Sequence, residues 1–138
     1  MRVISLSVDN WSGNRNREEE TNEPTWEQVE RAFRSLDARR HTMLTLEADE
    51  EDNGLIVGGG GGLYVVTVHR YPEIFTLMLA ETDDGETVRL TTGGQERIFP
   101  KNLCVGTAQA LLAMRRYFET CELEPSMRWI AEQAAQLT

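Results

Sequence analysis

The chain has 138 residues, of which 14 are basic and 23 acidic, so its formal net charge is −9. This length predicts a single domain over residues 1–138. The excess of carboxylates argues against direct binding of nucleic acid or docking on an anionic membrane, because both ligands require a basic surface. A basic partner protein would be attracted, although an acidic surface also keeps a protein soluble without any partner.

The N-terminal part of the chain predicts a strand, a loop and a helix. Val3–Val8 alternates apolar and polar residues, as a half-buried strand does. Residues 9–24 are polar and have no periodicity, which indicates a surface loop. The segment Thr25–Gln28 then fits a capping box, and the predicted helix runs toward Arg39 and Arg40, two cations suited to a helix C-terminus.

From residue 42 onward, short strands alternate with turns rich in glycine and proline, a pattern typical of an antiparallel meander. A second amphipathic helix is predicted over residues 101–119, then a short strand over 127–130 and a helical or frayed tail over 131–138. The sequence therefore predicts an α+β fold, an antiparallel sheet of about six to eight strands with two main helices packed on one face. The strands predicted between the helices are Met43–Ala48, Leu55–Gly58, Leu63–His69, Ile74–Ala80, Thr87–Thr92 and Gln95–Phe99.

Five consecutive glycines, Gly58–Gly62, raise the question of a phosphate site, because successive backbone amides can bind anions. A phosphate loop would end in Gly-Lys-Ser or Gly-Lys-Thr, and a dinucleotide fingerprint would lead into a helix. Leu63 and Tyr64 follow here instead and begin a predicted strand. We therefore interpret the run as a flexible hairpin turn and expect no cofactor.

The histidines and cysteines form no recognisable catalytic or metal site. His41 and His69 have no second ligand at metal spacing, so no metal ion is expected. Cys104 and Cys121 fall at the two ends of the predicted second helix, about 25 Å apart at roughly 1.5 Å per residue, which is beyond disulfide reach. Reduced thiols and a polar N-terminus, in place of a signal peptide, predict a cytoplasmic protein.

Acidic residues gather in three predicted connections, where they either form a solvated surface or receive a basic partner. Exposed loop tips give no desolvation, so catalysis by a pair of carboxylates is not expected there. The segments are 18–20, 47–52 and 83–86.

A set of apolar, aromatic, glycine and proline residues occurs along the chain in an order and at spacings typical of a known protein family. They are Trp26, Val29, Leu36, Leu55–Gly60, Tyr64–Val66, Thr92–Gln95, Phe99, Pro100, an alanine-rich helix ending in Tyr117 and Phe118, and the late Pro125 and Trp129. Over most of the chain, from Trp26 to Ile130, this pattern resembles the Imm1 family of bacterial immunity proteins.

The resemblance implies an α+β protein of the bacterial cytoplasm, encoded beside a polymorphic toxin that it neutralises by direct binding. Toxins linked to this family include nucleic-acid deaminases and other effectors, and a basic active-site cleft in such a toxin could be filled by an acidic inhibitor. A binding role needs no catalytic residue. We expect Glu50, Glu51, Asp52, Asp83, Asp84 and Glu86 to steer the toxin, with Trp11, Tyr71 and Gln95 as anchors.

Two other functions are compatible with the sequence. An enzyme of unrecognised type would bring His69, Cys104 and Glu96 together in a concave site. A structural or regulatory module would associate with a second copy of itself through an edge of the predicted sheet.

Overall fold

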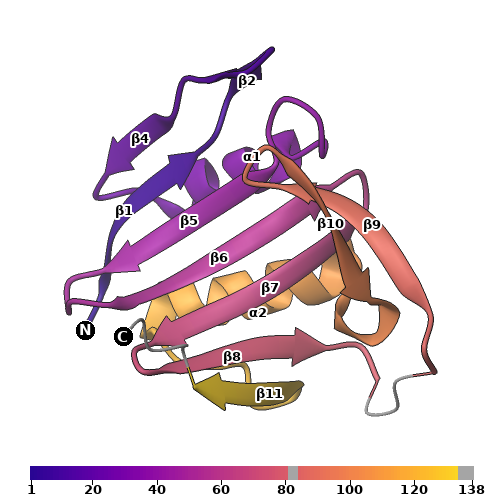
Figure 1. Cartoon of the computed structure of the whole chain (residues 1–138). Helices are drawn as coiled ribbons and strands as arrows, with labels where there is room; N and C mark the ends of the chain where they lie inside the picture. The colour runs from indigo at the N-terminus through magenta and orange to yellow at the C-terminus, as the bar shows by residue number, and fades with distance from the viewer. Residues whose placement is uncertain (81–83, 134–138) are drawn as a thin grey trace, which may run out of the picture.

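The computed structural model describes residues 1–80 and 84–133, which form an α+β structure of one large antiparallel sheet and two α-helices (Figure 1). The helices are α1 (Trp26–Ser35), the short 3-10 helix η1 (Lys101–Leu103) and α2 (Thr107–Thr120). The strands are β1 (Val3–Val8), β2 (Trp11–Ser12), β3 (Arg15–Asn16), β4 (Glu19–Asn22), β5 (Met43–Ala48), β6 (Asn53–Gly60), β7 (Leu63–Arg70), β8 (Glu73–Met78), β9 (Thr87–Thr92), β10 (Gln95–Pro100) and β11 (Arg128–Gln133).

The large sheet has seven strands in the order β11-β8-β7-β6-β5-β1-β4, and all of its neighbouring pairs are antiparallel. Both α-helices lie on one face of it, as predicted (Figure 1). Alternate residues of the strands point to that face and pack with apolar stripes of the helices. Large side chains buried in this core include Val29, Phe33, Leu44, Leu46, Leu55, Val57, Val66, Val68, Met114 and Tyr117.

The β9–β10 hairpin forms a sheet of its own instead of continuing the meander. It crosses in front of β6 and β7, on the face opposite the helices (Figure 1). Beneath it, Val65 of β7 packs with Leu90 and Cys104 in a second, smaller core. The hairpin therefore covers one end of this face of the large sheet and leaves the other end open.

The prediction of a surface loop over residues 9–24 is wrong in part. The segment contains a short β2–β3 hairpin, and β4 pairs with β1 as an edge strand of the large sheet. Three of the four residues of β4 are exposed, so the strand has none of the apolar alternation that reveals a half-buried strand in a sequence.

Both helices are shorter than predicted. Helix α1 ends at Ser35, because the carboxylate of Asp37 accepts hydrogen bonds from the backbone N–H groups of Arg39, Arg40 and His41 and holds the chain in a turn. The two arginines therefore do not lie in the last turn of the helix. Helix α2 begins only at Thr107, because Val105 pairs with Tyr64 of β7 through two backbone hydrogen bonds of 2.8 and 2.9 Å.

The run Gly58–Gly62 is only partly a turn. Gly58, Gly59 and Gly60 belong to β6, and the hairpin turn consists of Gly61 and Gly62 alone. A Cβ atom at Gly58 would lie 2.5 Å from Cγ2 of Thr92, so the absence of a side chain there lets the β9–β10 hairpin approach the sheet.

The C-terminal strand is longer than predicted, because β11 continues to Gln133 as the edge strand beside β8. The prediction of a helical or frayed tail is therefore wrong for residues 131–133, and its remainder lies outside the described residues. Within residues 1–80 and 84–133, no helix is long and apolar enough to cross a membrane.

Candidate partner-binding site

The open end of the sheet carries a hollow of about 440 Å³, which we call the acidic hollow. Two hairpin turns form its rim, the β5–β6 turn with Glu50, Glu51 and Asp52 and the β7–β8 turn with Tyr71. A backbone hydrogen bond of 3.2 Å from Tyr71 to the carbonyl oxygen of Asp52 joins the two turns. Three predicted steering residues and one predicted anchor are thus brought to a single site.

The floor of the acidic hollow is a row of residues that face each other across four strands. Glu47 of β5 is paired with Gly54 of β6, which is paired with His69 of β7 and, through it, with Ile74 of β8. Gly54 has no side chain to fill the middle of the row, and a Cβ atom there would lie 2.7 Å from the carbonyl oxygen of Leu46. The close approach of β5 to β6 therefore keeps this position open.

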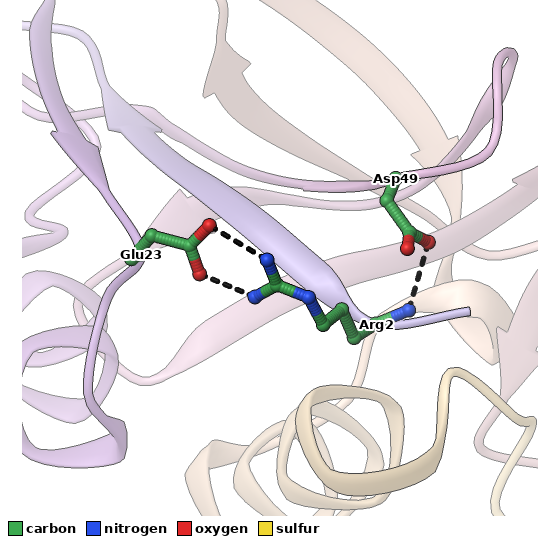
Figure 2. Close-up of polar contacts among 3 residues, drawn as sticks. All are labelled: Arg2, Glu23 and Asp49. Atoms are coloured by element: carbon green, nitrogen blue, oxygen red, sulfur yellow. Dashed lines mark hydrogen bonds and ion pairs between the residues drawn. The ribbon is translucent and has the colours of Figure 1, made fainter.

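Arg2 fixes the start of the β5–β6 turn, as Figure 2 shows. Its backbone N–H donates to a carboxylate oxygen of Asp49 at 2.9 Å, and its guanidinium forms a bidentate ion pair with Glu23. The hydrogen bond from the Arg2 side chain lowers the pKa of Glu23, and the one from the Arg2 backbone lowers the pKa of Asp49. The Asp49 carboxylate is therefore engaged within the chain, whereas those of Glu50, Glu51 and Asp52 have no partner among residues 1–80 and 84–133.

Five carboxylates line the acidic hollow. Within the described part of the chain, none of them forms an ion pair or accepts a hydrogen bond through its carboxylate oxygens. Like charges held this close repel one another, and a bound cation would relieve that repulsion. The five residues are Glu47, Glu50, Glu51, Asp52 and Glu73.

A tyrosine and a histidine, Tyr71 and His69, also line the acidic hollow. Tyr71 is 60% exposed on the rim and presents its ring to solvent, as an aromatic anchor of an interface does. His69 is half-buried in the floor, where its Nε2 lies 3.3 Å from the hydroxyl of Thr67. Burial lowers the pKa of His69, so the neutral imidazole is favoured.

The second predicted acidic connection lies apart from the acidic hollow. The carboxylate of Asp84 accepts a hydrogen bond of 2.9 Å from the backbone of Glu86, whose own carboxylate forms an ion pair with Lys101 at 2.8 Å. Asp83 lies outside the described residues. Asp84 and Glu86 are exposed but engaged within the chain, so their charge is less available to a partner than that of the β5–β6 turn.

The two remaining predicted anchors lie at the other end of β5, near the β9–β10 turn. Trp11 is half-buried, and its indole N–H donates to the carboxylate of Asp9 at 2.8 Å. A Cβ atom at Gly94 would lie 2.3 Å from the Trp11 ring, so the ring is held against that turn. Gln95 is exposed and accepts a hydrogen bond from Arg97 at 3.3 Å. Trp11 is therefore a structural residue in large part, and Gln95 remains on the surface.

The three residues of the enzyme hypothesis lie in three different surroundings. His69 lines the acidic hollow, Cys104 is 1% exposed in the core beneath the β9–β10 hairpin, and Glu96 lies on the outer side of β10 with Arg89 at 3.5 Å. Burial raises the pKa of Cys104, which disfavours the thiolate that nucleophilic catalysis needs. Both cysteines are free thiols, and the described residues hold no cluster of metal-ligating side chains.

Sequence reasoning missed two parts of the charged surface. Glu73 lies on β8, and only the strand register shows that it borders the same hollow as the β5–β6 turn; Glu47, expected in the connection over residues 47–52, lies on β5. It also missed an arginine cluster around the β2–β3 hairpin, formed by Arg15, Arg17 and Arg40. The signal for that cluster was the pair of arginines in an otherwise polar loop and the Arg39–Arg40 doublet after the first helix.

A family model described as Immunity protein Imm1 matches residues 17–131, most of the chain. The matched range includes the whole acidic hollow and begins within the arginine cluster, at Arg17. No curated protein matches the sequence.

Proposed function

Because the chain belongs to the Imm1 family of immunity proteins, we propose that it binds and neutralises a cognate toxin by direct, stoichiometric inhibition in the bacterial cytoplasm. The acidic hollow is the docking surface in this proposal, and it receives a basic element of the toxin. The observation that carries the proposal is the group of five carboxylates at the open end of the sheet, which form no ion pair with any described residue.

The geometry suits capture of a lysine- or arginine-bearing segment. The β5–β6 turn presents three consecutive exposed acidic residues, which attract a basic surface over a distance of about one Debye length, roughly 8–10 Å in physiological salt. Tyr71 then offers an exposed ring against which a guanidinium or an apolar side chain can pack. A toxin that acts on nucleic acid would carry a basic cleft of this kind, and we extend the proposal to that class.

Growth rescue tests the function itself. The toxin-like open reading frame adjacent to the gene is expressed alone and together with this chain, and growth and co-purification are recorded. Rescue with a complex of fixed stoichiometry supports the proposal. Failure of both, with a toxin that kills cells on its own, would contradict it.

Paired charge variants test the surface. We expect Glu50→Gln/Glu51→Gln to slow association with the toxin about three- to tenfold at low salt, because it removes two unpaired charges from the rim. The matched control is Asp84→Asn/Glu86→Gln, which removes two charges from the other acidic connection. Equal rates for the wild type and the rim variant, measured by stopped-flow, would show that the toxin docks elsewhere.

A further inference from the structure

An arginine-lined cleft of about 670 Å³ lies at the end of the molecule away from the acidic hollow. The β2–β3 hairpin and the turn after α1 form its walls. Strand β5 begins beside this cleft and runs toward the β5–β6 turn on the rim of the acidic hollow, a length of roughly 20 Å for six residues at about 3.4 Å each. The residues that line the cleft are Asn10, Ser12, Arg15, Asn16, Arg17 and Arg40.

The arginines of this cleft are not neutralised within the described part of the chain. The side chains of Arg15 and Arg17 form no hydrogen bond or ion pair there, and Arg40 donates only to the backbone oxygen of Trp11, at 3.4 Å. By contrast, Arg2, Arg34, Arg89, Lys101 and Arg115 each pair with a glutamate on the surface.

Two carboxylates beside the cleft, those of Glu19 and Asp37, accept hydrogen bonds within the chain. Glu19 accepts a hydrogen bond from the side-chain amide of Asn10 at 3.2 Å. Asp37 accepts three hydrogen bonds from backbone N–H groups, which together outweigh the effect of its burial and lower its pKa. The charged side chains that line the cleft itself are nevertheless all arginines, in a molecule whose net charge is −9.

The walls of the cleft are held in place before any ligand binds. A backbone hydrogen bond of 2.8 Å joins Trp11 to the carbonyl oxygen of Arg40, and another of the same length joins Arg17 to the carbonyl oxygen of Asn10. The backbone N–H of Asn10 also donates to the side-chain oxygen of Asn16, at 2.8 Å. A backbone that is fixed before binding lowers the entropic cost of capturing an anion, because only the arginine side chains are then ordered on binding.

We propose that this arginine cleft binds a short, carboxylate-bearing segment of a partner protein. The segment is short because the acidic run Glu18–Glu20 follows the hairpin directly and would repel a long polyanion. That same run disfavours nucleic acid, whose backbone carries a charge about every 1.7 Å. The inference concerns a second surface and goes beyond the docking of a toxin on the acidic hollow.

A titration with a hexaglutamate peptide tests the inference without any toxin. The ¹⁵N-labelled full chain is titrated at low salt, and the arginine side-chain N–H signals are followed by NMR. We expect shifts at Arg15, Arg17 and Arg40, and an affinity about fivefold to tenfold weaker in Arg15→Gln/Arg17→Gln, since each exposed charge pair contributes modestly. Both side chains are exposed and form no hydrogen bond or ion pair with the described residues, so we expect this variant to keep the fold.

The control variant is Arg34→Gln/Lys101→Gln, which removes the same charge from two sites that do not line the cleft. Its affinity for hexaglutamate should equal that of the wild type. Equal affinities for all three proteins, or shifts spread evenly over the surface arginines, would overturn the inference. It would also be overturned if inorganic phosphate or a DNA duplex shifted the cleft signals and hexaglutamate did not.

Discussion

Asp9 is a buried acidic residue whose hydrogen bonds hold together the end of the sheet where β5 begins. It is 3% exposed, and its carboxylate accepts hydrogen bonds from the backbone N–H groups of Thr42 and Met43, the Thr42 hydroxyl and the Trp11 indole. The Thr42 hydroxyl in turn accepts from the backbone of Gly94 at 2.9 Å. One side chain thus joins β1, β5, the β2–β3 hairpin and the β9–β10 turn.

Asp9→Asn should destabilise the chain by about 2–4 kcal/mol, because the amide nitrogen would face N–H donors and the buried donors would lose a charged acceptor. Urea denaturation followed by tryptophan fluorescence measures the loss. Asp49→Asn is the control, since Asp49 is exposed and accepts from one backbone N–H of Arg2. A loss for Asp9→Asn no larger than that of the control would contradict the role assigned to the network.

His69 should make the stability of the chain depend on pH just below neutrality. Burial lowers its pKa below the ordinary 6.5, so protonation is harder in the folded chain than in the unfolded one. The free energy of unfolding should therefore fall as pH drops through the lowered pKa, and the dependence should be weaker in His69→Gln. Urea denaturation at several values between pH 7.5 and pH 5 measures it, with His41→Gln as the control. An unchanged dependence in His69→Gln would contradict the assignment.

At the scale of elements, the β9–β10 hairpin depends on a few buried contacts. Leu90 is 7% exposed against Val65 and Cys104, whereas Ile98 of the same hairpin is 62% exposed. Leu90→Ala should cost about 2–4 kcal/mol of stability, because it leaves a cavity in a small core. Ile98→Ala should change stability by less than about 0.5 kcal/mol. Similar losses in thermal denaturation would mean that the hairpin is not held by this core.

Elements with strong apolar periodicity were predictable from the sequence. Strands β1, β5 and β7 were placed to within one residue at each end, because alternation or a continuous apolar run marks them. Strand β4 was not, since a polar edge strand is stabilised by pairing with β1 and not by burial. The late start of α2 was hidden as well, because the pairing of Val105 with Tyr64 joins residues far apart in the chain.

The candidate site was predictable only where it lies in one segment. The turn Glu50–Asp52 is a run of carboxylates that any reading of the sequence singles out. The proximity of Tyr71 follows from two hairpin turns meeting at one end of the sheet, which requires the strand order. The separation of Trp11 and Gln95 from that turn could not be predicted either, because it depends on which end of β5 each connection reaches.

On the scale of the whole molecule, charge is distributed along the direction of β5. The acidic hollow lies at the end of the strand and the arginine cleft near its start. A partner with one basic and one acidic surface would meet this chain in a single favoured orientation, because the reverse orientation places like charges together.

Association with the toxin should therefore depend strongly on ionic strength. Raising the salt from about 0.05 M to about 0.5 M shortens the Debye length from roughly 14 Å to 4 Å, so we expect the association rate to fall about tenfold or more while dissociation changes little. Stopped-flow kinetics over this range measure both rates. An association rate independent of salt would show that the charge asymmetry does not guide the encounter.

The glycine run of β6 has a consequence for how the sequence can change. Gly58 lacks a side chain where Cβ and Cγ2 of Thr92 would lie 2.9 and 2.5 Å from a new Cβ atom. Gly58→Ala alone should push the β9–β10 hairpin away from the sheet and lower the melting temperature. Adding Thr92→Gly removes the side chain that the new methyl group would meet, so the double variant should recover part of the lost melting temperature. A double-mutant cycle measures this coupling, which additive losses would exclude. Substitutions at positions 58 and 92 are then coupled: a larger residue at position 58 is tolerated only when a smaller residue replaces Thr92.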